Sequence, residues 1–139
     1  MSKVLIIEDE LHTAQPVKEA LALESIPSDI ANDGTTGLAM FVEGDYDLVL
    51  LDLKMPGMSG EEVLTAIRKE DPFVDIIIYT NYTDFEDIKR LTNIGIDGYI
   101  NKGAGADLFT LVDAIKKKLA PLSDDMIDIL LDSVPDVQE

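Results

Sequence analysis

The sequence predicts an α/β fold in which five parallel strands are covered by helices on both faces. Short apolar runs recur along the chain, and the segments between them carry apolar residues at helical spacing. The runs are continuous rather than alternating, as expected for strands buried on both faces of a parallel sheet. Strands that alternate with helices indicate successive strand–helix units. The expected strands are VLII (4–7), SDIA (28–31), LVLL (48–51), DIIIY (75–79) and GYI (98–100).

The first helix is expected within residues 11–25. Pro16 would interrupt its hydrogen bonds, so Thr13 is the better N-cap because it leaves Pro16 in the first turn. The residues expected to face the core are Val17, Leu21 and Leu23.

Local signals predict where the later helices begin and end. Residues 33–34 can open the second helix, and the capping boxes at 59–62 and 83–86 can open the third and fourth. Gly95 is a suitable C-terminal stop, and the lysines at 116–118 favour the end of a helix over 106–119. The apolar residues expected in these helices are Leu38, Ala39 and Val42, then Val63, Leu64 and Ile67, then Ile88 and Leu91, and last Leu108, Leu111, Val112 and Ile115.

Length and composition favour a single globular domain. The chain has 139 residues and is 46% hydrophobic, which is enough to form a core. We assign residues 1–120 to this domain and 121–139 to an acidic C-terminal tail with six acids and no base. Ser123 can cap a short extra helix in the tail. That helix would either pack on its own domain or fray. Alternatively, it would dock a partner or a second copy, or begin an output domain.

The charge balance excludes several function classes. With 11 basic and 28 acidic residues the net charge is −17, which argues against direct binding to nucleic acid or to anionic membranes. There is no cysteine, which excludes disulfides and thiolate metal sites. The apolar runs are too short to span a membrane, and the acids at 8–10 interrupt any signal peptide. We therefore expect a cytoplasmic protein.

Polar residues stand at the ends of four expected strands. Glu8 and Asp9 follow the first strand, Asp52 the third, Thr80 the fourth and Lys102 the last. In a parallel sheet the carboxyl ends of the strands share one edge, where ligands bind. Each residue alone is more often a cap or a surface charge, but their joint placement predicts a site.

The chemistry of this set suggests phosphoryl transfer. Three neighbouring carboxylates repel one another unless a cation joins them, and oxygen ligands without histidine or cysteine favour Mg²⁺ or Mn²⁺. Asp52 would be the nucleophile that forms an aspartyl phosphate, and Lys102 would stabilise the transferred charge. The hydroxyl of Thr80, with Lys102, would complete the phosphoryl-binding site.

The segments VLIIEDE, LVLLDLKMPGMSG, IIIYTN and DGYINK resemble, in order, the signatures of two-component response regulator receiver domains. The resemblance covers residues 3 to about 120. It implies a flavodoxin-like, doubly wound (βα)5 three-layer sandwich with strand order 2-1-3-4-5. Pro56 and Gly57 suit the tight turn after Asp52.

The resemblance also implies roles for individual residues. Asp52 would accept phosphate from a sensor histidine kinase or a phosphotransfer protein. Glu8, Asp9, Asp52 and the backbone carbonyl of Lys54 would hold the metal. Thr80 and Tyr99 would be a switch pair that signals to a protein partner, or to a second copy, through the surface formed by the fourth helix, the fifth strand and the fifth helix.

Some positions depart from the family pattern or carry a weaker signal. Glu8 replaces the more usual aspartate, and Asn81 replaces a smaller residue, so Asn81 is expected to narrow access to the phosphoryl group. His12 is expected to be a solvated helix-start residue, and GAGAD (103–107) to be a helix lead-in rather than a nucleotide loop.

The phosphoacceptor switch is not expected to act as an enzyme on a separate substrate, and two other functions compete with it. A haloacid-dehalogenase-like phosphatase needs a second aspartate two residues after the nucleophile, where this chain has Lys54. A phosphate-independent interaction module of the same fold usually loses part of the site, whereas every site residue is present here.

Overall fold

The computed structural model describes residues 2–81, 84–102 and 107–120, and these contain one five-stranded sheet of order β2-β1-β3-β4-β5. All four strand pairings are parallel, which confirms the predicted topology. The elements are β1 Val4–Ile7, α1 Leu11–Leu23, β2 Ser28–Ala31, α2 Gly34–Glu43, β3 Leu48–Leu51, α3 Gly60–Glu70, β4 Asp75–Thr80, α4 Phe85–Ile94, β5 Gly98–Asn101 and α5 Leu108–Leu119.

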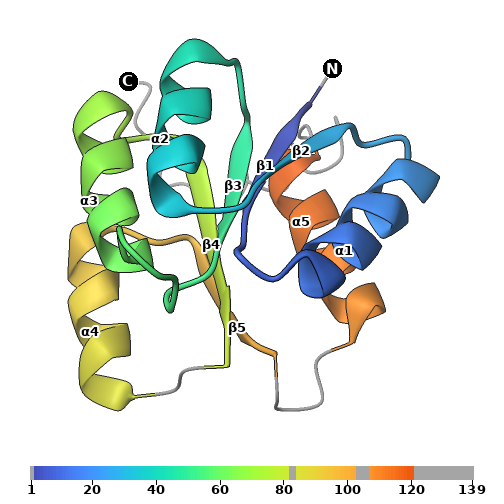
Figure 1. The fold of residues 1–139 in the computed structure, drawn as a ribbon. Helices are drawn as coiled ribbons and strands as arrows, with labels where there is room; N and C mark the ends of the chain where they lie inside the picture. Colours follow the sequence, from blue (N-terminus) through green and yellow to red (C-terminus); the bar gives the residue numbers. More distant parts are fainter. Residues whose placement is uncertain (1, 82–83, 103–106, 121–139) are drawn as a thin grey trace, which may run out of the picture.

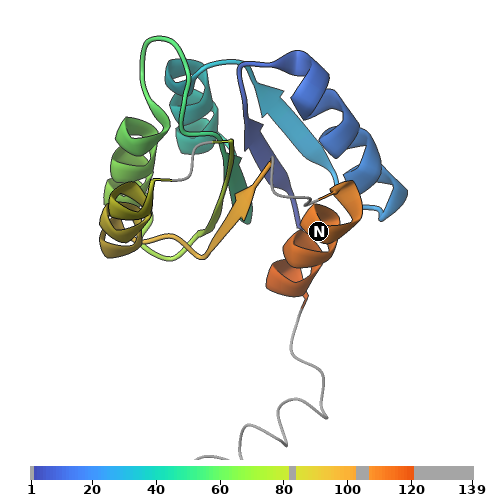
Figure 2. The same ribbon diagram turned by 90° about the horizontal axis from the view of Figure 1, so that it is seen from below.

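The helices form two outer layers around the sheet. Helices α2, α3 and α4 cover one face and α1 and α5 cover the other, as both views show (Figures 1 and 2). This is the three-layer sandwich expected from the sequence.

The central strands β1 and β3 are buried on both faces, which explains their continuous aliphatic sequences. Because successive side chains point to opposite faces, each strand contributes to two separate cores. Leu5 and Ile7 pack under α2, α3 and α4, whereas Val4 and Ile6 pack under α1 and α5. The edge strands β2 and β5 are only partly buried.

Helix α1 differs from the prediction in its N-cap and in one residue of its expected core face. It begins at Leu11, and the backbone N–H of Thr13 donates to the carbonyl of Glu10 (2.9 Å), so Thr13 lies in the first turn and is not the N-cap. Pro16 therefore lies inside the helix, on its exposed side. Leu23 is 86% exposed because it lies two residues beyond buried Leu21, and this spacing places it on the opposite side of a helix.

The buried face of α2 was predicted only in part, since of the three predicted residues Leu38 alone packs against the core. Its buried residues are Gly34, Gly37 and Phe41, while Ala39 and Val42 are exposed. A Cβ atom on Gly37 would lie 2.6 Å from Cδ1 of Ile7. The backbone of α2 thus packs directly on β1, so small residues make the contact.

The capping signals were correct for two helices and shifted by one residue for a third. Asp33 caps α2, and Ser59 with Glu62 forms the predicted capping box of α3. Helix α4 begins at Phe85, capped by Asp84 rather than by a box at 83–86, and Thr83 lies outside the described residues.

The C-terminal end of α4 and most of the buried face of α5 agree with the prediction. Gly95 ends α4 with φ +124°, a conformation that favours glycine. Asp107 caps α5, so this helix starts two residues later than predicted, and Leu108 in its first turn is partly exposed. The predicted residues Leu111, Val112 and Ile115 are buried.

Among the described residues, no helix has the length and apolar character needed to cross a membrane. The predicted tail helix in 121–139 lies outside the described residues.

Candidate functional site

The two most buried acids are held by the central strands of the sheet. The backbone N–H of Glu8 donates to the carbonyl of Ala31 (3.0 Å), and that of Asp52 donates to the carbonyl of Ile7 (3.1 Å). The backbone hydrogen bonds between neighbouring strands therefore continue one residue beyond the ends of β1 and β3. Glu8 and Asp52 stand on a rigid support, and only 3% and 6% of their surfaces are exposed.

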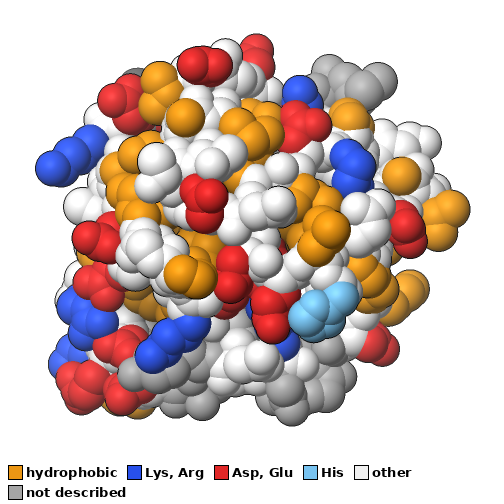
Figure 3. All heavy atoms as spheres, in the orientation of Figure 1, with side chains coloured by type: hydrophobic (Ala, Val, Ile, Leu, Met, Phe, Trp, Pro, Cys, Tyr) orange, Lys and Arg blue, Asp and Glu red, His pale blue; other side chains and the backbone are white. Residues whose placement is uncertain are grey.

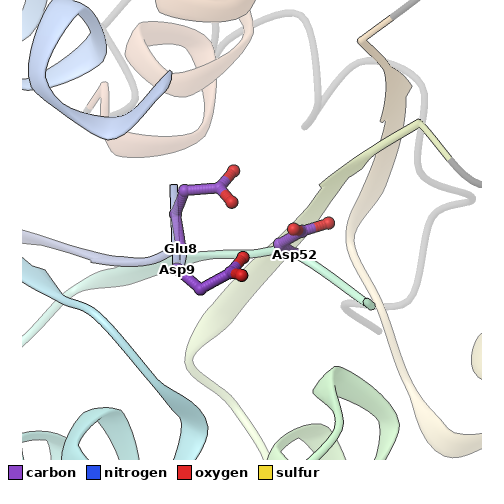
Figure 4. Close-up of side chains that lie close together, drawn as sticks. All are labelled: Glu8, Asp9 and Asp52. Atoms are coloured by element: carbon purple, nitrogen blue, oxygen red, sulfur yellow. The ribbon is translucent and has the colours of Figure 1, made fainter. Parts of the chain in front are cut away.

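Glu8, Asp9 and Asp52 form one carboxylate cluster, as predicted. One carboxylate oxygen from each lies within 4.8 Å of the others, and Figure 4 shows the three side chains next to one another at the ends of β1 and β3. A set of closely spaced oxygen donors without sulfur or nitrogen fits a hard divalent cation such as Mg²⁺.

Lys102 reaches this cluster from the end of β5. Its ammonium contacts a carboxylate oxygen of Glu8 and lies 3.5 Å from Oδ2 of Asp52. The same nitrogen lies 5.4 Å from the ring centre of Tyr79, a contact that the sequence analysis missed. Lys102 is thus fixed where it can meet negative charge that develops at Asp52.

One lysine does not balance three carboxylates. Burial is the largest cause that raises the pKa of Glu8, and the charge of Asp52 adds to it, so this pKa rises to about 7 despite the contact with Lys102. Burial alone would lower the pKa of Lys102, but its contacts with Glu8 and Asp52 together raise it. The cluster therefore favours additional positive charge, as a bound cation would supply.

Thr80 and Tyr99 lie on the same face of the sheet. Thr80 is buried at the end of β4, two residues beyond Ile78, and Ile78 is the register partner of Tyr99. Tyr99 is half-buried, and its pKa is raised first by burial and then by the charge of Asp87. This placement is compatible with the predicted switch, which stays a prediction.

The loop after Asp52 folds back on itself. The N–H of Leu53 donates to Oδ1 of Asp52 (2.8 Å), and Gly57 has φ +76°, as its predicted turn requires. The N–H of Gly60 donates to the carbonyl of Leu53 (3.0 Å). A Cβ atom on Gly60 would lie only 2.1 Å from the carbonyl oxygen of Asp52. This requirement was not predicted from the sequence, because it depends on the contact between the start of α3 and the residues that follow β3.

A cavity of about 230 Å³ opens in front of the cluster. Glu10, Lys54 and Asn81 are exposed around it, and the sequence analysis had given no role to Glu10. The predicted effect of Asn81 on access and the predicted metal contact of the Lys54 carbonyl stay predictions. The residues that line the cavity are Asp9, Glu10, Asp52, Lys54, Thr80, Asn81 and Lys102.

The two weaker sequence signals lie beside this site. His12 is exposed in the first turn of α1, as expected. Most of the 103–107 segment lies outside the described residues.

Known proteins share this fold. A receiver domain protein from Methanospirillum hungatei has a TM-score of 0.81 and 29% identity over 93% of this chain and 98% of its own. TrrA from Thermotoga maritima, solved in complex with Mg²⁺ and BeF, has a TM-score of 0.75 and 36% identity over 86% of this chain and 100% of its own.

Sequence comparison agrees with the structural one. The sensory transduction protein RegX3 of Mycobacterium tuberculosis is 32% identical over 136 residues, which are 97% of this chain and 60% of RegX3. The chain thus spans less than two thirds of the length of this relative. The family model for the response regulator receiver domain matches residues 4–116. The chain therefore belongs to the response regulator receiver domain family.

Proposed function

We propose that Asp52 accepts a phosphoryl group from the phosphohistidine of a sensor histidine kinase or a phosphotransfer protein. The observation that carries this proposal is the convergence of Asp9, Asp52 and Lys102 on one cavity at the carboxyl edge of the sheet. Glu8 lies behind them, in the same carboxylate cluster and in contact with Lys102. TrrA has also been solved in complex with the histidine kinase ThkA, and TrrA in that complex is 34% identical to this chain.

In the proposed reaction a carboxylate oxygen of Asp52 attacks phosphorus. The P–N bond to the donor imidazole breaks as the P–O bond forms. The released nitrogen takes a proton from solvent water, so that the donor histidine leaves as neutral imidazole. The N–H of Leu53 fixes Oδ1 of Asp52, which leaves Oδ2 on the side of Lys102. The Lys102 ammonium then stabilises the negative charge on the transferred group.

Glu8, Asp9, Asp52 and the Lys54 carbonyl would hold Mg²⁺ or Mn²⁺, which supplies charge neutralisation for the phosphoryl oxygens. The raised pKa of Glu8 supports this assignment because a bound cation would favour the ionised carboxylate. No reaction on a separate substrate is proposed.

The response to phosphorylation would pass through Thr80 and Tyr99. The hydroxyl of Thr80 would move toward the new charge, and Tyr99 would follow on the same face of the sheet. The proposed output is a protein partner, or a second copy, bound at the α4–β5–α5 surface. The absence of direct nucleic-acid contact and the cytoplasmic location are predictions from the sequence.

Incubation with acetyl phosphate and Mg²⁺ tests the proposal. Wild-type protein should gain a single acid-stable, hydroxylamine-labile phosphoryl group, and Asp52→Asn should gain none. Equal labelling of both proteins would remove Asp52 from the mechanism.

A further inference from the structure

Tyr79 stands in the same row of the sheet as the two most buried acids. The register pairs Ile7 with Leu51 and Leu51 with Ile78, so the next residue on each of these three strands falls in one row across the sheet. The residues of this row are Glu8, Asp52 and Tyr79. All three side chains point to the face covered by α1 and α5, because each follows a residue of that core by two positions.

Lys102 must cross β4 to reach the acids of this row. It follows β5, so one strand lies between it and Asp52, and two strands lie between it and Glu8. Tyr79 is the register partner of Ile100, and Lys102 is the next residue after Ile100 on the same face. The ammonium of Lys102 ends over the ring of Tyr79, 5.4 Å from its centre, a geometry in which an aromatic ring attracts a cation.

Burial strengthens this attraction. A cation over an aromatic ring gains little when water surrounds it and several times more when it is desolvated. Figure 3 shows basic side chains at the surface of the face viewed, whereas the side chain of Lys102 is only 10% exposed. Tyr79 also borders a narrow gap beside Thr13, Ala14 and Val17 of α1, and this gap is too small for a water molecule. The ring therefore meets a cation that has lost most of its hydration.

We propose that Tyr79 is a positioning residue for phosphoryl transfer, and that its ring face keeps the Lys102 ammonium beside Asp52. This inference rests on the proposed function of Asp52. The ammonium lies closer to the carboxylate of Glu8 than to that of Asp52, which is 3.5 Å away. Seen from β5, Glu8 is one strand beyond Asp52, so its attraction draws the ammonium past the acceptor. The ring of Tyr79 lies on the near side of Asp52 and acts in the opposite direction.

The neutral ring matters most when the carboxylates share their charge with a bound cation. Glu8, Asp9 and Asp52 then attract the ammonium less strongly, because part of their negative charge is balanced. The ring of Tyr79 carries no net charge that a metal could balance, so its attraction for Lys102 persists. The ammonium stays beside Asp52, where the oxygens of the transferred phosphoryl group need positive charge.

Two substitutions separate the ring face from the size of the side chain. Tyr79→Leu fills the position with apolar carbons but has no ring, whereas Tyr79→Phe keeps the ring and removes only the hydroxyl. With acetyl phosphate and fixed Mg²⁺, Tyr79→Leu should label Asp52 roughly three- to tenfold more slowly than wild type, and Tyr79→Phe should recover most of that rate.

Tyr46→Leu is the matched control. The ammonium of Lys3 lies 5.1 Å from the centre of the Tyr46 ring, so this change removes a second tyrosine–lysine contact. Tyr46 precedes β3 and therefore lies at the opposite edge of the sheet from Asp52. Tyr46→Leu should be labelled at the wild-type rate.

Nuclear magnetic resonance observes the position of Lys102 without any phosphodonor. Protons above an aromatic ring are shielded, so the ε-methylene protons of Lys102 should resonate upfield of those of the other lysines, with and without Mg²⁺. Lys102→Arg identifies this signal by its loss. The upfield shift should remain in Tyr79→Phe and disappear in Tyr79→Leu, which a role in packing alone would not predict.

The positioning role is overturned if Tyr79→Leu is labelled as fast as wild type, or if Tyr79→Phe is labelled as slowly as Tyr79→Leu. An equal loss of rate in Tyr46→Leu, or an unshifted Lys102 signal in wild type, would overturn it as well. Failure of wild type to be labelled would instead overturn the proposed function of Asp52 and this inference with it, even if the shift of the Lys102 signal still showed the contact with Tyr79.

Discussion

Replacement of Gly60 by alanine should destabilise the protein and displace the acceptor loop. A Cβ atom at this position would lie 2.1 Å from the carbonyl oxygen of Asp52 and 2.6 Å from Cα of Leu53. Both atoms belong to the backbone, so no side-chain rotation can relieve the contact. The first distance is more than an ångström short of the 3.4 Å at which ordinary contacts begin.

The expected loss of stability follows from the tight packing around Gly60. Overpacking in a core costs about 1–3 kcal/mol, and a backbone clash at the end of a buried strand belongs at the upper end, roughly 3 kcal/mol. For a domain of this size that loss should lower Tm by roughly 10 °C. Because Asp52 itself must shift, labelling by acetyl phosphate should also slow.

Urea unfolding followed by circular dichroism measures the free energy of unfolding directly. Gly98→Ala is the matched control, because its Cβ would meet only the Ile77 side chain at 3.4 Å. It should stay near wild-type stability. If Gly60→Ala lost no more stability than Gly98→Ala, the close approach of α3 to the Asp52 carbonyl would be refuted.

Three further predictions concern the metal, the far end of the sheet and the switch. The pKa of Glu8 is raised to about 7, so protons compete with Mg²⁺ for this carboxylate below that pH. The Mg²⁺ affinity measured by calorimetry should therefore fall by up to about tenfold per pH unit below 7. Glu8→Gln should bind Mg²⁺ more weakly than wild type, and its affinity should not depend on pH in this range. The side chain of Arg68 is 13% exposed and donates hydrogen bonds to three backbone carbonyls and to Asp97. Arg68→Lys should therefore lower the free energy of unfolding, measured in urea, by roughly 2 kcal/mol. An unchanged stability would contradict these contacts. Phosphorylation of wild type should change the amide hydrogen exchange of α4 and β5. Thr80→Ala should still be phosphorylated on Asp52 but should not show this change. If the exchange response of Thr80→Ala were the same as that of wild type, the switch would be rejected.

The strands were predicted well because their signal is local. LVLL and VLII coincide with β3 and β1, since a strand buried on both faces must be apolar at every position. Once the strands were placed, the parallel topology brought their carboxyl ends together, so Glu8, Asp52 and Lys102 could be assigned to one site before any contact was known.

The errors arose where packing between elements decides the outcome. The buried face of α2 consists mainly of glycines because its backbone approaches Ile7 at Gly37, and Met58 and Val63 at Gly34. A search for large apolar residues selected Val42 instead. The need for glycine at position 60 also depends on a contact between two segments. Neither contact can be read from spacing along one helix.

The contacts of Arg68 show the same limit. Its side chain joins the end of α3 to Val74 before β4 and to Gly95 and Asp97 before β5. The sequence presents it as one of two basic residues in the last turn of an amphipathic helix, where a solvated charge is the ordinary expectation. Only the fold brings the three segments together.

The phosphorylation of Asp52 is the central claim, and intact-protein mass spectrometry tests it most directly. Wild type, Asp52→Asn and wild type with EDTA are each incubated with acetyl phosphate and Mg²⁺. The account predicts one added phosphoryl group on wild type, and none on Asp52→Asn or after chelation. An unlabelled wild type would contradict it and leave a phosphate-independent module of the same fold. Labelling of Asp52→Asn to the same extent would also contradict it, because the phosphoryl group would then lie on another residue.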